Sequence, residues 1–273
     1  MKDFFSFSLS EIICRGTNWL LMIMMPFFLS SKEYGKINLI FVFITIISSF
    51  ILYGQHKVVL RYYHEFVEKE KFIITTFSLW FTLANSTLIV LFIISFFLNF
   101  DKIFGFSLST TYLFLLFIII LLSSFRQLYL SLLISENKSK KYFIDSIVFQ
   151  ILKLTFIILF LFNLENFKGY ILGFFISIAL ISCFEVIIYV KENNNYSYDK
   201  KLIKKFWLFG WPFVFHFLGG NILSYMDRFL IEQILNLSDV GVYSFSYNLG
   251  SSLAFLYAPF VVFFEPRMSN PAG

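Results

Sequence analysis

The sequence predicts an all-α, polytopic membrane protein with about eight transmembrane helices. Hydrophobic residues make up 58% of the 273 residues and charged residues only 14%, whereas soluble domains are about a quarter charged. The apolar runs are continuous and reach the ~20 residues that a spanning helix needs. A transmembrane β-barrel would instead show segments of roughly ten residues with strict alternation.

Five predicted spans carry no charged residue: 37–56, 72–100, 103–125, 206–226 and 240–264. Three more apolar segments contain isolated charges: 9–29 with Glu11 and Arg15, 143–164 with Asp145 and Lys153, and 169–190 with Glu185. The segment 9–29 lacks the basic start, short uncharged core and small-residue end of a cleavable signal peptide. We therefore expect it to remain as the first helix.

Basic residues between the spans are distributed unevenly. With the N-terminus inside, the inner segments hold fourteen Lys and Arg residues, and the outer segments hold Lys32, Lys36, Lys102 and Lys168. Because cytoplasmic loops carry the excess of Lys and Arg, both termini are expected in the cytoplasm. The net charge of +5 therefore indicates topology signals and contacts with anionic lipid headgroups, and no nucleic-acid partner is expected.

A short turn motif occurs twice, 206 residues apart. The shift places Glu33 on Asp239 and Gly35 on Gly241, within SSKEYG and NLSDVG. An offset of six helices is even, so two halves of equal orientation are expected, as in parallel-repeat transporters. This predicts a six-helix lobe at 1–190, a cytoplasmic linker at 191–206, and the first two helices of a second lobe at 207–273. Since a complete second lobe needs about 140 residues more, we expect a C-terminal truncation.

Polar residues form a stripe on the seventh predicted helix and its continuation. At 100° per residue, five of them lie within about 100° of one another: Asn221, Ser224, Tyr225, Arg228 and Glu232. Arg228 is expected to pair with Glu232, one turn on, whereas Asp227 needs a neighbouring helix or solvent. For Asp227 and Arg228, a structural pairing between helices and a direct ligand contact both stay open.

The first helix carries a similar stripe, because the same shift places Arg15 on Asn221 and Asn18 on Ser224. A charge at the bilayer centre costs roughly 2.5–3.5 kcal/mol, so such charges usually face protein or a watery cavity. We therefore expect the two stripes to line one cavity between the lobes.

Two further cations, Arg126 and Lys153, lie in predicted spans. Arg126, like Glu185, lies within two turns of the cytoplasmic end of its helix, where a side chain can also extend to the membrane surface. Both interpretations stay open for these two residues. Lys153 is surrounded by apolar sequence, which favours a position in the protein interior.

Signatures of catalysis are missing from the sequence. It contains no H-E-x-x-H, no Walker A lysine loop and no G-x-S-x-G. Cys14 and Cys183 lie in apolar segments and are expected to be free, buried thiols. We expect no enzymatic activity, no cofactor and no metal site.

Three stretches resemble the Wzx-type polysaccharide flippases of the multidrug/oligosaccharidyl-lipid/polysaccharide exporter superfamily. They are SSKEYGKINLIFVF, GQHKVVLRYYHE and MDRFLIEQILNLSDVGVYSFSYNLGSSLAFLYAPF, and the resemblance extends over about residues 12–267. It implies a bacterial inner-membrane protein that moves undecaprenyl-pyrophosphate-linked oligosaccharide repeat units to the outer leaflet, for O-antigen, lipopolysaccharide or other surface polysaccharides. The polysaccharide polymerase and chain-length machinery are further candidate partners. Members usually have twelve or more helices, and this chain departs from that number.

The lipid-linked substrate carries a diphosphate, which favours a cationic path through the bilayer. Five residues are candidates to line it: Arg15, Arg61, Arg126, Lys153 and Arg228. Three alternatives stay open: a flippase for lipid II or a teichoic-acid precursor, an antiporter for drugs and cations, and an inactive truncated membrane protein.

Overall fold

The computed structural model describes residues 2–97, 104–164, 166–192 and 199–251, and within these ranges the chain is helical without a strand. The elements are α1 (Lys2–Met24), the 3₁₀ turn η1 (Met25–Phe27), α2 (Ser31–Ile51), α3 (Gln55–Tyr62), α4 (Lys69–Phe97), α6 (Thr110–Ser135), α7 (Ser139–Leu164), α8 (Phe167–Glu192), α9 (Lys200–Ile234) and α10 (Leu237–Ser251). The prediction of an all-α polytopic membrane protein is confirmed.

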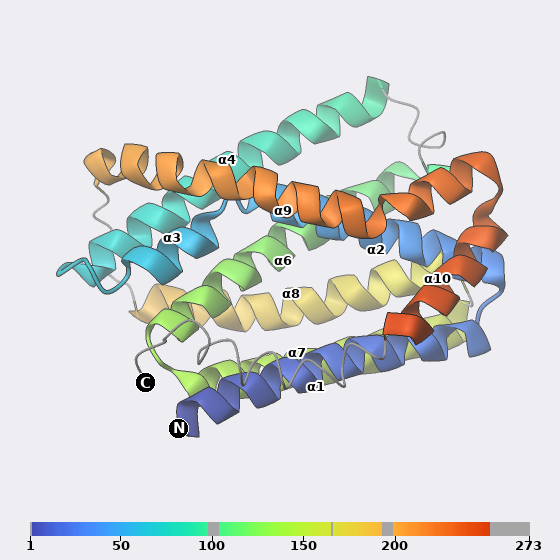
Figure 1. Ribbon diagram of the computed structural model, residues 1–273, viewed down its shortest axis with the longest axis horizontal. Helices are drawn as coiled ribbons and strands as arrows, with labels where there is room; N and C mark the ends of the chain where they lie inside the picture. Colours follow the sequence, from blue (N-terminus) through green and yellow to red (C-terminus); the bar gives the residue numbers. More distant parts are fainter. Residues whose placement is uncertain (1, 98–103, 165, 193–198, 252–273) are drawn as a thin grey trace, which may run out of the picture.

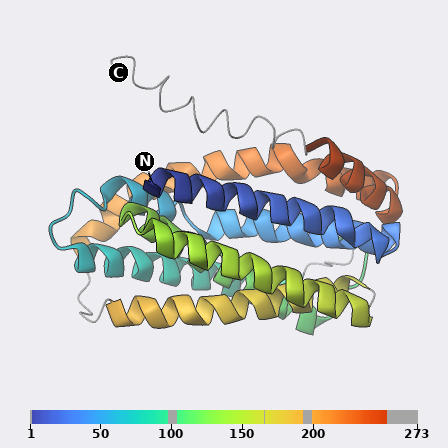
Figure 2. The same cartoon turned by 90° about the horizontal axis from the view of Figure 1, so that it is seen from below.

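Six described helices are long and apolar enough to cross a membrane: α2, α4, α6, α7, α8 and α9. The long helices run side by side along the long axis of the molecule, and the chain changes ends with each one (Figures 1 and 2). The predicted span 9–29 coincides mostly with α1, and the last predicted span, 240–264, begins in α10 and continues outside the described residues. The alternation brings the predicted basic inner segments to one end of the bundle.

The predicted span 37–56 is wrong at its C-terminal end, because a tight turn separates α2 from α3. Tyr53 and Gly54 have φ angles of 49° and 66°, in the left-handed region that ends a helix. Gly54 also packs directly on the backbone of Gly210 in α9, where a Cβ atom would lie 3.0 Å from the Gly210 Cα. The sequence conceals this turn, because Gln55 and His56 carry no formal charge and leave the run looking uninterrupted.

Helices extend from both sides into the segment predicted as a linker, 191–206. Helix α8 extends to Glu192 and α9 begins at Lys200, so both helices continue past their apolar parts. Asp199 caps α9 by accepting a hydrogen bond from the Lys201 backbone N–H at 2.8 Å, which satisfies one of the free N–H groups at a helix start. Helix α9 then continues through Pro212 without interruption.

Helices α2 and α10 begin in the same way, at positions related by the 206-residue shift. Ser30 caps α2 by accepting from the Glu33 backbone N–H at 3.3 Å. Asn236, the equivalent residue, accepts from the Ser238 and Asp239 backbone N–H groups at 2.8 and 3.1 Å. Both starts lie at the same end of the molecule (Figure 1). The repeated turn is thus a repeated helix N-cap.

The two helix starts pack against each other through the repeated glycines. A Cβ atom on Gly35 would lie 3.1 Å from the Gly241 backbone nitrogen and collide with the Leu237 carbonyl oxygen. A Cβ atom on Gly241 would lie 3.3 Å from the Gly35 nitrogen and collide with the Ser31 carbonyl oxygen. The contact is reciprocal, as in an interface between two symmetry-related surfaces, and it brings the backbones of α2 and α10 into direct contact.

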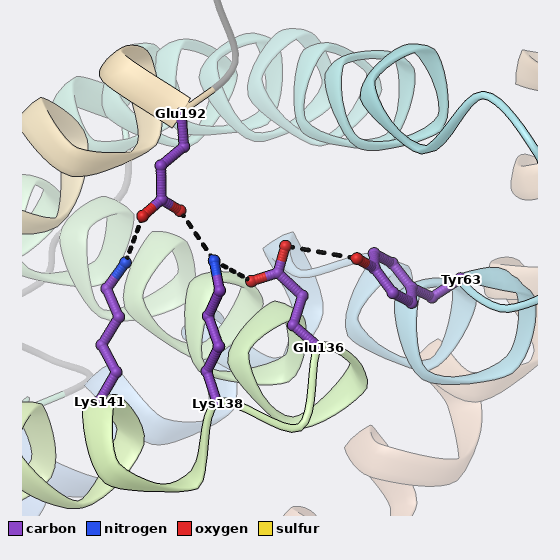
Figure 3. A network of polar contacts seen from close by, with 5 residues as sticks. All are labelled: Tyr63, Glu136, Lys138, Lys141 and Glu192. Atoms are coloured by element: carbon purple, nitrogen blue, oxygen red, sulfur yellow. Dashed lines mark hydrogen bonds and ion pairs between the residues drawn. The ribbon is translucent and has the colours of Figure 1, made fainter.

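A polar network joins α3, α6, α7 and α8 at the opposite end of the bundle (Figure 3). Lys138 bridges Glu136 at 2.8 Å and Glu192 at 3.1 Å, and Lys141 binds the second carboxylate oxygen of Glu192 at 2.8 Å. Tyr63 donates to Glu136 at 3.4 Å, and burial together with the Glu136 carboxylate raises the pKa of this phenol. The network fixes the ends of three long helices beside the basic segments.

Candidate functional site

A cavity of about 330 Å³ lies between α1, α2, α9 and α10. Its lining combines aromatic rings, side-chain amides and hydroxyls with one cation, and consists of Asn18, Trp19, Met22, Asn38, Phe41, Ser224, Tyr225, Arg228, Tyr247, Asn248 and Ser251. The volume is at the small end of the range for ligand pockets. The predicted polar faces of the first helix and of α9 therefore meet at Asn18, Ser224 and Arg228.

Arg228 is the cation in this lining, and its side chain is only 3% exposed. The guanidinium carbon lies over the rings of Tyr225 and Tyr247, at 5.2 and 4.7 Å from their centroids, a geometry that stabilises a cation. Nη1 donates to the Ser224 carbonyl oxygen at 3.3 Å and contacts the Asp227 carboxylate at 3.3 Å. The other guanidinium nitrogen, Nη2, and Nε have no hydrogen bond to a described residue.

The expected pair between Arg228 and Glu232 is wrong, because Arg228 pairs with its neighbour Asp227. The Asp227 carboxylate folds back to accept from the Arg228 backbone N–H at 2.8 Å, which brings it within reach of the guanidinium. Its other oxygen accepts from the Tyr243 hydroxyl on α10, so Asp227 has the partner expected from a neighbouring helix. Glu232 instead lies against Gly105, which has a φ of 66° and leaves room for the carboxylate.

Lys153 lies in the interior, as favoured by its sequence context, with 6% of the residue exposed. Its ammonium group donates to the Asn18 side-chain oxygen at 2.7 Å and lies 5.0 Å from the centroid of the Phe174 ring. Lys153 is not among the described residues that line the cavity, whereas Asn18 is one of them. Lys153 is therefore linked to the cavity through the amide of Asn18.

The remaining candidates lie away from the cavity. Arg126 is buried between α6, α7 and α8, where it pairs with Asp145 and Glu185, so neither Arg126 nor Glu185 extends to the membrane surface. Arg15 and Arg61 have side chains 67% and 61% exposed and form surface pairs, Arg15 with Glu11 within α1 and Arg61 with Glu65 in the turn after α3. Asn221 donates to the Ser49 hydroxyl on α2 at 2.9 Å and joins α9 to α2.

Sequence reasoning missed much of the cavity lining. Trp19 donates its indole N–H to the Asn248 carbonyl oxygen at 2.8 Å, and the Asn248 amide donates to the Tyr34 hydroxyl at 2.9 Å. Asn38 donates to the Tyr34 carbonyl oxygen at 2.9 Å. Asn38 and Asn248 are single amides within apolar helices. The criterion applied to Lys153, that a polar residue surrounded by apolar sequence lies in the protein interior, therefore also selects them.

The six membrane-spanning helices define a polytopic membrane protein, and the cavity between α1, α2, α9 and α10 is its candidate site. The chain belongs to the polysaccharide biosynthesis protein family, whose model matches residues 1–270. A solved structure named only "protein A" superimposes with a TM-score of 0.70 at 18% identity, covering 96% of this chain and 62% of the other. The likeness shows the fold, and the chain spans less than two thirds of that relative. No curated protein sequence matches this chain.

Proposed function

We propose that this protein moves undecaprenyl-pyrophosphate-linked oligosaccharide repeat units across the bacterial inner membrane, from the cytoplasmic to the outer leaflet, as a Wzx-type flippase. The cavity between α1, α2, α9 and α10 is the observation that carries the proposal. Its aromatic rings, amides and hydroxyls match the apolar faces and hydroxyls of sugars, which need both stacking and hydrogen bonds. The polysaccharide polymerase and chain-length machinery are the proposed partners downstream.

Arg228 is the group proposed to bind the diphosphate. Its guanidinium is buried beside the cavity, and two of its nitrogens have no hydrogen bond to a described residue. A planar guanidinium binds phosphate oxygens with two parallel hydrogen bonds. Asp227 neutralises Arg228 while the cavity is empty of substrate, and the diphosphate replaces that carboxylate when it binds.

The charge of the cavity weighs against an antiporter for cationic drugs. Among the described residues its lining has one arginine and no acidic residue, whereas a site for organic cations needs carboxylates or an aromatic cage free of a competing cation. A flippase for lipid II or a teichoic-acid precursor uses the same chemistry as the proposed substrate. These substrates differ in the sugar that they carry, so the identity of the transported sugar distinguishes them.

The lobes are proposed to correspond to α1–α8 and to α9 with α10, and both chain ends to lie in the cytoplasm. The basic segments that gather beside the network of Figure 3 support this orientation. The cavity would then lie at the boundary between the lobes, where parallel-repeat transporters bind their substrates.

The decisive experiment deletes the chromosomal gene and measures surface polysaccharide after complementation. Wild-type protein should restore it, Arg228→Ala should abolish it with lipid-linked repeat units accumulating, and Arg61→Ala should restore it, because Arg61 is exposed and away from the cavity. Membrane abundance of each variant is measured by immunoblot. Full restoration by Arg228→Ala contradicts the assignment of the diphosphate site.

Cysteine labelling tests the cavity independently of transport. In a background without Cys14 and Cys183, cysteines at Asn18 and Ser224 should react with a small hydrophilic thiol reagent, because both residues line the cavity. Leu20 and Leu230 are matched controls on the same helices, half exposed on the apolar surface and expected to face lipid. Equal labelling at all four positions would remove the case for a water-accessible cavity.

A further inference from the structure

A second buried charge cluster lies between α6, α7 and α8, apart from the cavity. Arg126 of α6 contacts the carboxyl groups of Asp145 on α7 and Glu185 on α8. Asp145 lies six residues after the start of α7, and Glu185 seven residues before the end of α8, which places both about 10 Å inside their helices. The cluster therefore joins three helices within the apolar part of the bundle.

The charges of this cluster do not balance if both carboxyl groups are ionised. One guanidinium faces two carboxylates, and the side chains of Arg126, Asp145 and Glu185 are 7%, 14% and 1% exposed. A net negative charge buried in an apolar environment is unfavourable by several kcal/mol. The cluster needs one more positive charge.

The hydrogen bonds show where that charge is missing. The carboxyl groups of Asp145 and Glu185 contact the same nitrogen, Arg126 Nη1, and therefore lie beside each other. A hydrogen bond between them requires a proton on one of them. Glu185 Oε2 is a buried atom without a hydrogen-bond donor among the described residues, whereas Asp145 Oδ1 lies 2.6 Å from Arg126 Nη1. A single proton held between the two carboxyl groups supplies a donor and removes the excess charge.

We propose that Asp145 and Glu185 form a proton-binding site, in which the pair shares one proton and Arg126 neutralises the remaining carboxylate. A metal ion is the less suitable ligand, because no group of three or more His, Cys, Asp or Glu side chains that could hold one occurs among the described residues. Release of the proton leaves an unpaired charge between α6, α7 and α8. The packing of these helices is thus expected to depend on pH.

The other titratable groups around the cluster do not supply the missing charge. Three of them, Tyr129 on α6, Tyr142 on α7 and Cys14 on α1, interact with its members, and these residue types are neutral near pH 7. Glu11 on α1 accepts from the Tyr142 hydroxyl at 2.7 Å, and Lys141 lies 5.8 Å from the centroid of the Tyr129 ring but is bound to Glu192. Neither contacts the pair.

Infrared spectroscopy of the purified full-length chain in lipid nanodiscs tests the proposal. The wild-type protein should show the C=O stretching band of a protonated carboxylic acid, and the band should disappear in Glu185→Gln or Asp145→Asn, each of which leaves one carboxylate for Arg126. Glu11→Gln, which removes a half-exposed carboxylate at the same end, should retain the band.

Thermal unfolding of the same samples gives a second measurement. The wild-type melting temperature should fall as pH rises through the range where the band is lost, because the folded state holds a proton that the unfolded state releases. Glu185→Gln and Asp145→Asn should show no such fall. An acid band that is absent from the wild type or unchanged in both amide variants overturns the proposal, as does stabilisation by Na⁺ without an acid band.

Discussion

Replacing Gly35 or Gly241 by alanine should destabilise the contact between α2 and α10. The added methyl group would collide with a backbone carbonyl oxygen, of Leu237 or Ser31 respectively, and would also lie 3.1 or 3.3 Å from a backbone nitrogen. Backbone atoms cannot rotate away as a flexible side chain can, so the two helices must separate. Overpacking of this kind costs about 1–3 kcal/mol.

The assay is thermal unfolding of purified protein in nanodiscs. A loss of that size lowers the melting temperature of a chain of this length by roughly 2–12 °C. The double variant should lose less than the sum of the two single variants, because one displacement of α10 relieves both collisions. Gly219→Ala is the matched control: a Cβ atom there meets nothing within 4 Å, and alanine is favoured over glycine in a helix by about 1 kcal/mol.

A Gly35→Ala variant whose melting temperature is no lower than that of the wild type would refute the close approach of the two helices. It would also remove the structural reason for the repeated glycine. Strictly additive losses would show instead that each collision is relieved locally, without movement of α10 as a unit.

Three further predictions concern the topology and two single side chains. Reporter fusions after Lys205 should report cytoplasm and those after Lys168 periplasm, and a periplasmic signal at Lys205 contradicts the proposed topology. Glu33→Ala should lower stability by about 1.5–3 kcal/mol, because this carboxylate accepts from the Phe167 backbone N–H at 2.9 Å and joins α2 to α8; an unchanged melting curve is the contrary result. Glu192→Gln should lower the free energy of unfolding by less than about 1 kcal/mol, since the Glu192 side chain is 43% exposed. This loss of stability should vanish at high salt. A large loss that does not depend on salt would mean that the network of Figure 3 is buried.

The transmembrane helices were predictable from the sequence because hydrophobicity is a property of each segment alone. The turn at Gly54 was not, because it depends on the close approach of Gly210 from α9. The repeat of the glycine turn was visible in the sequence, but the structural reason for the glycines was not. Only the packing of α2 on α10 shows that Gly35 and Gly241 are small because each faces the backbone of the other helix.

The candidate site was predictable only in part, because helical spacing orders the residues of one helix and says nothing about which helices meet. The 206-residue shift places Asn18 on Ser224, and both residues line the cavity. The partner of Arg228 was predicted wrongly, because the Asp227 side chain folds back onto its own helix. Asp145 and Glu185 looked like isolated charges in two spans until the packing of α7 on α8 brought them to Arg126.

The intramembrane cations differ in how their charge is offset, and this difference separates their roles. Arg126 contacts two buried carboxyl groups, so binding a diphosphate there would break both contacts within the bundle. Lys153 has a neutral amide as its partner and is separated from the cavity by Asn18. Arg228 has a single carboxylate, on the adjacent residue, whose side chain is 34% exposed. Because Asp227 can be hydrated when it leaves the guanidinium and also keeps its contact with Tyr243, Arg228 can exchange its partner for a ligand at the smallest cost in buried charge.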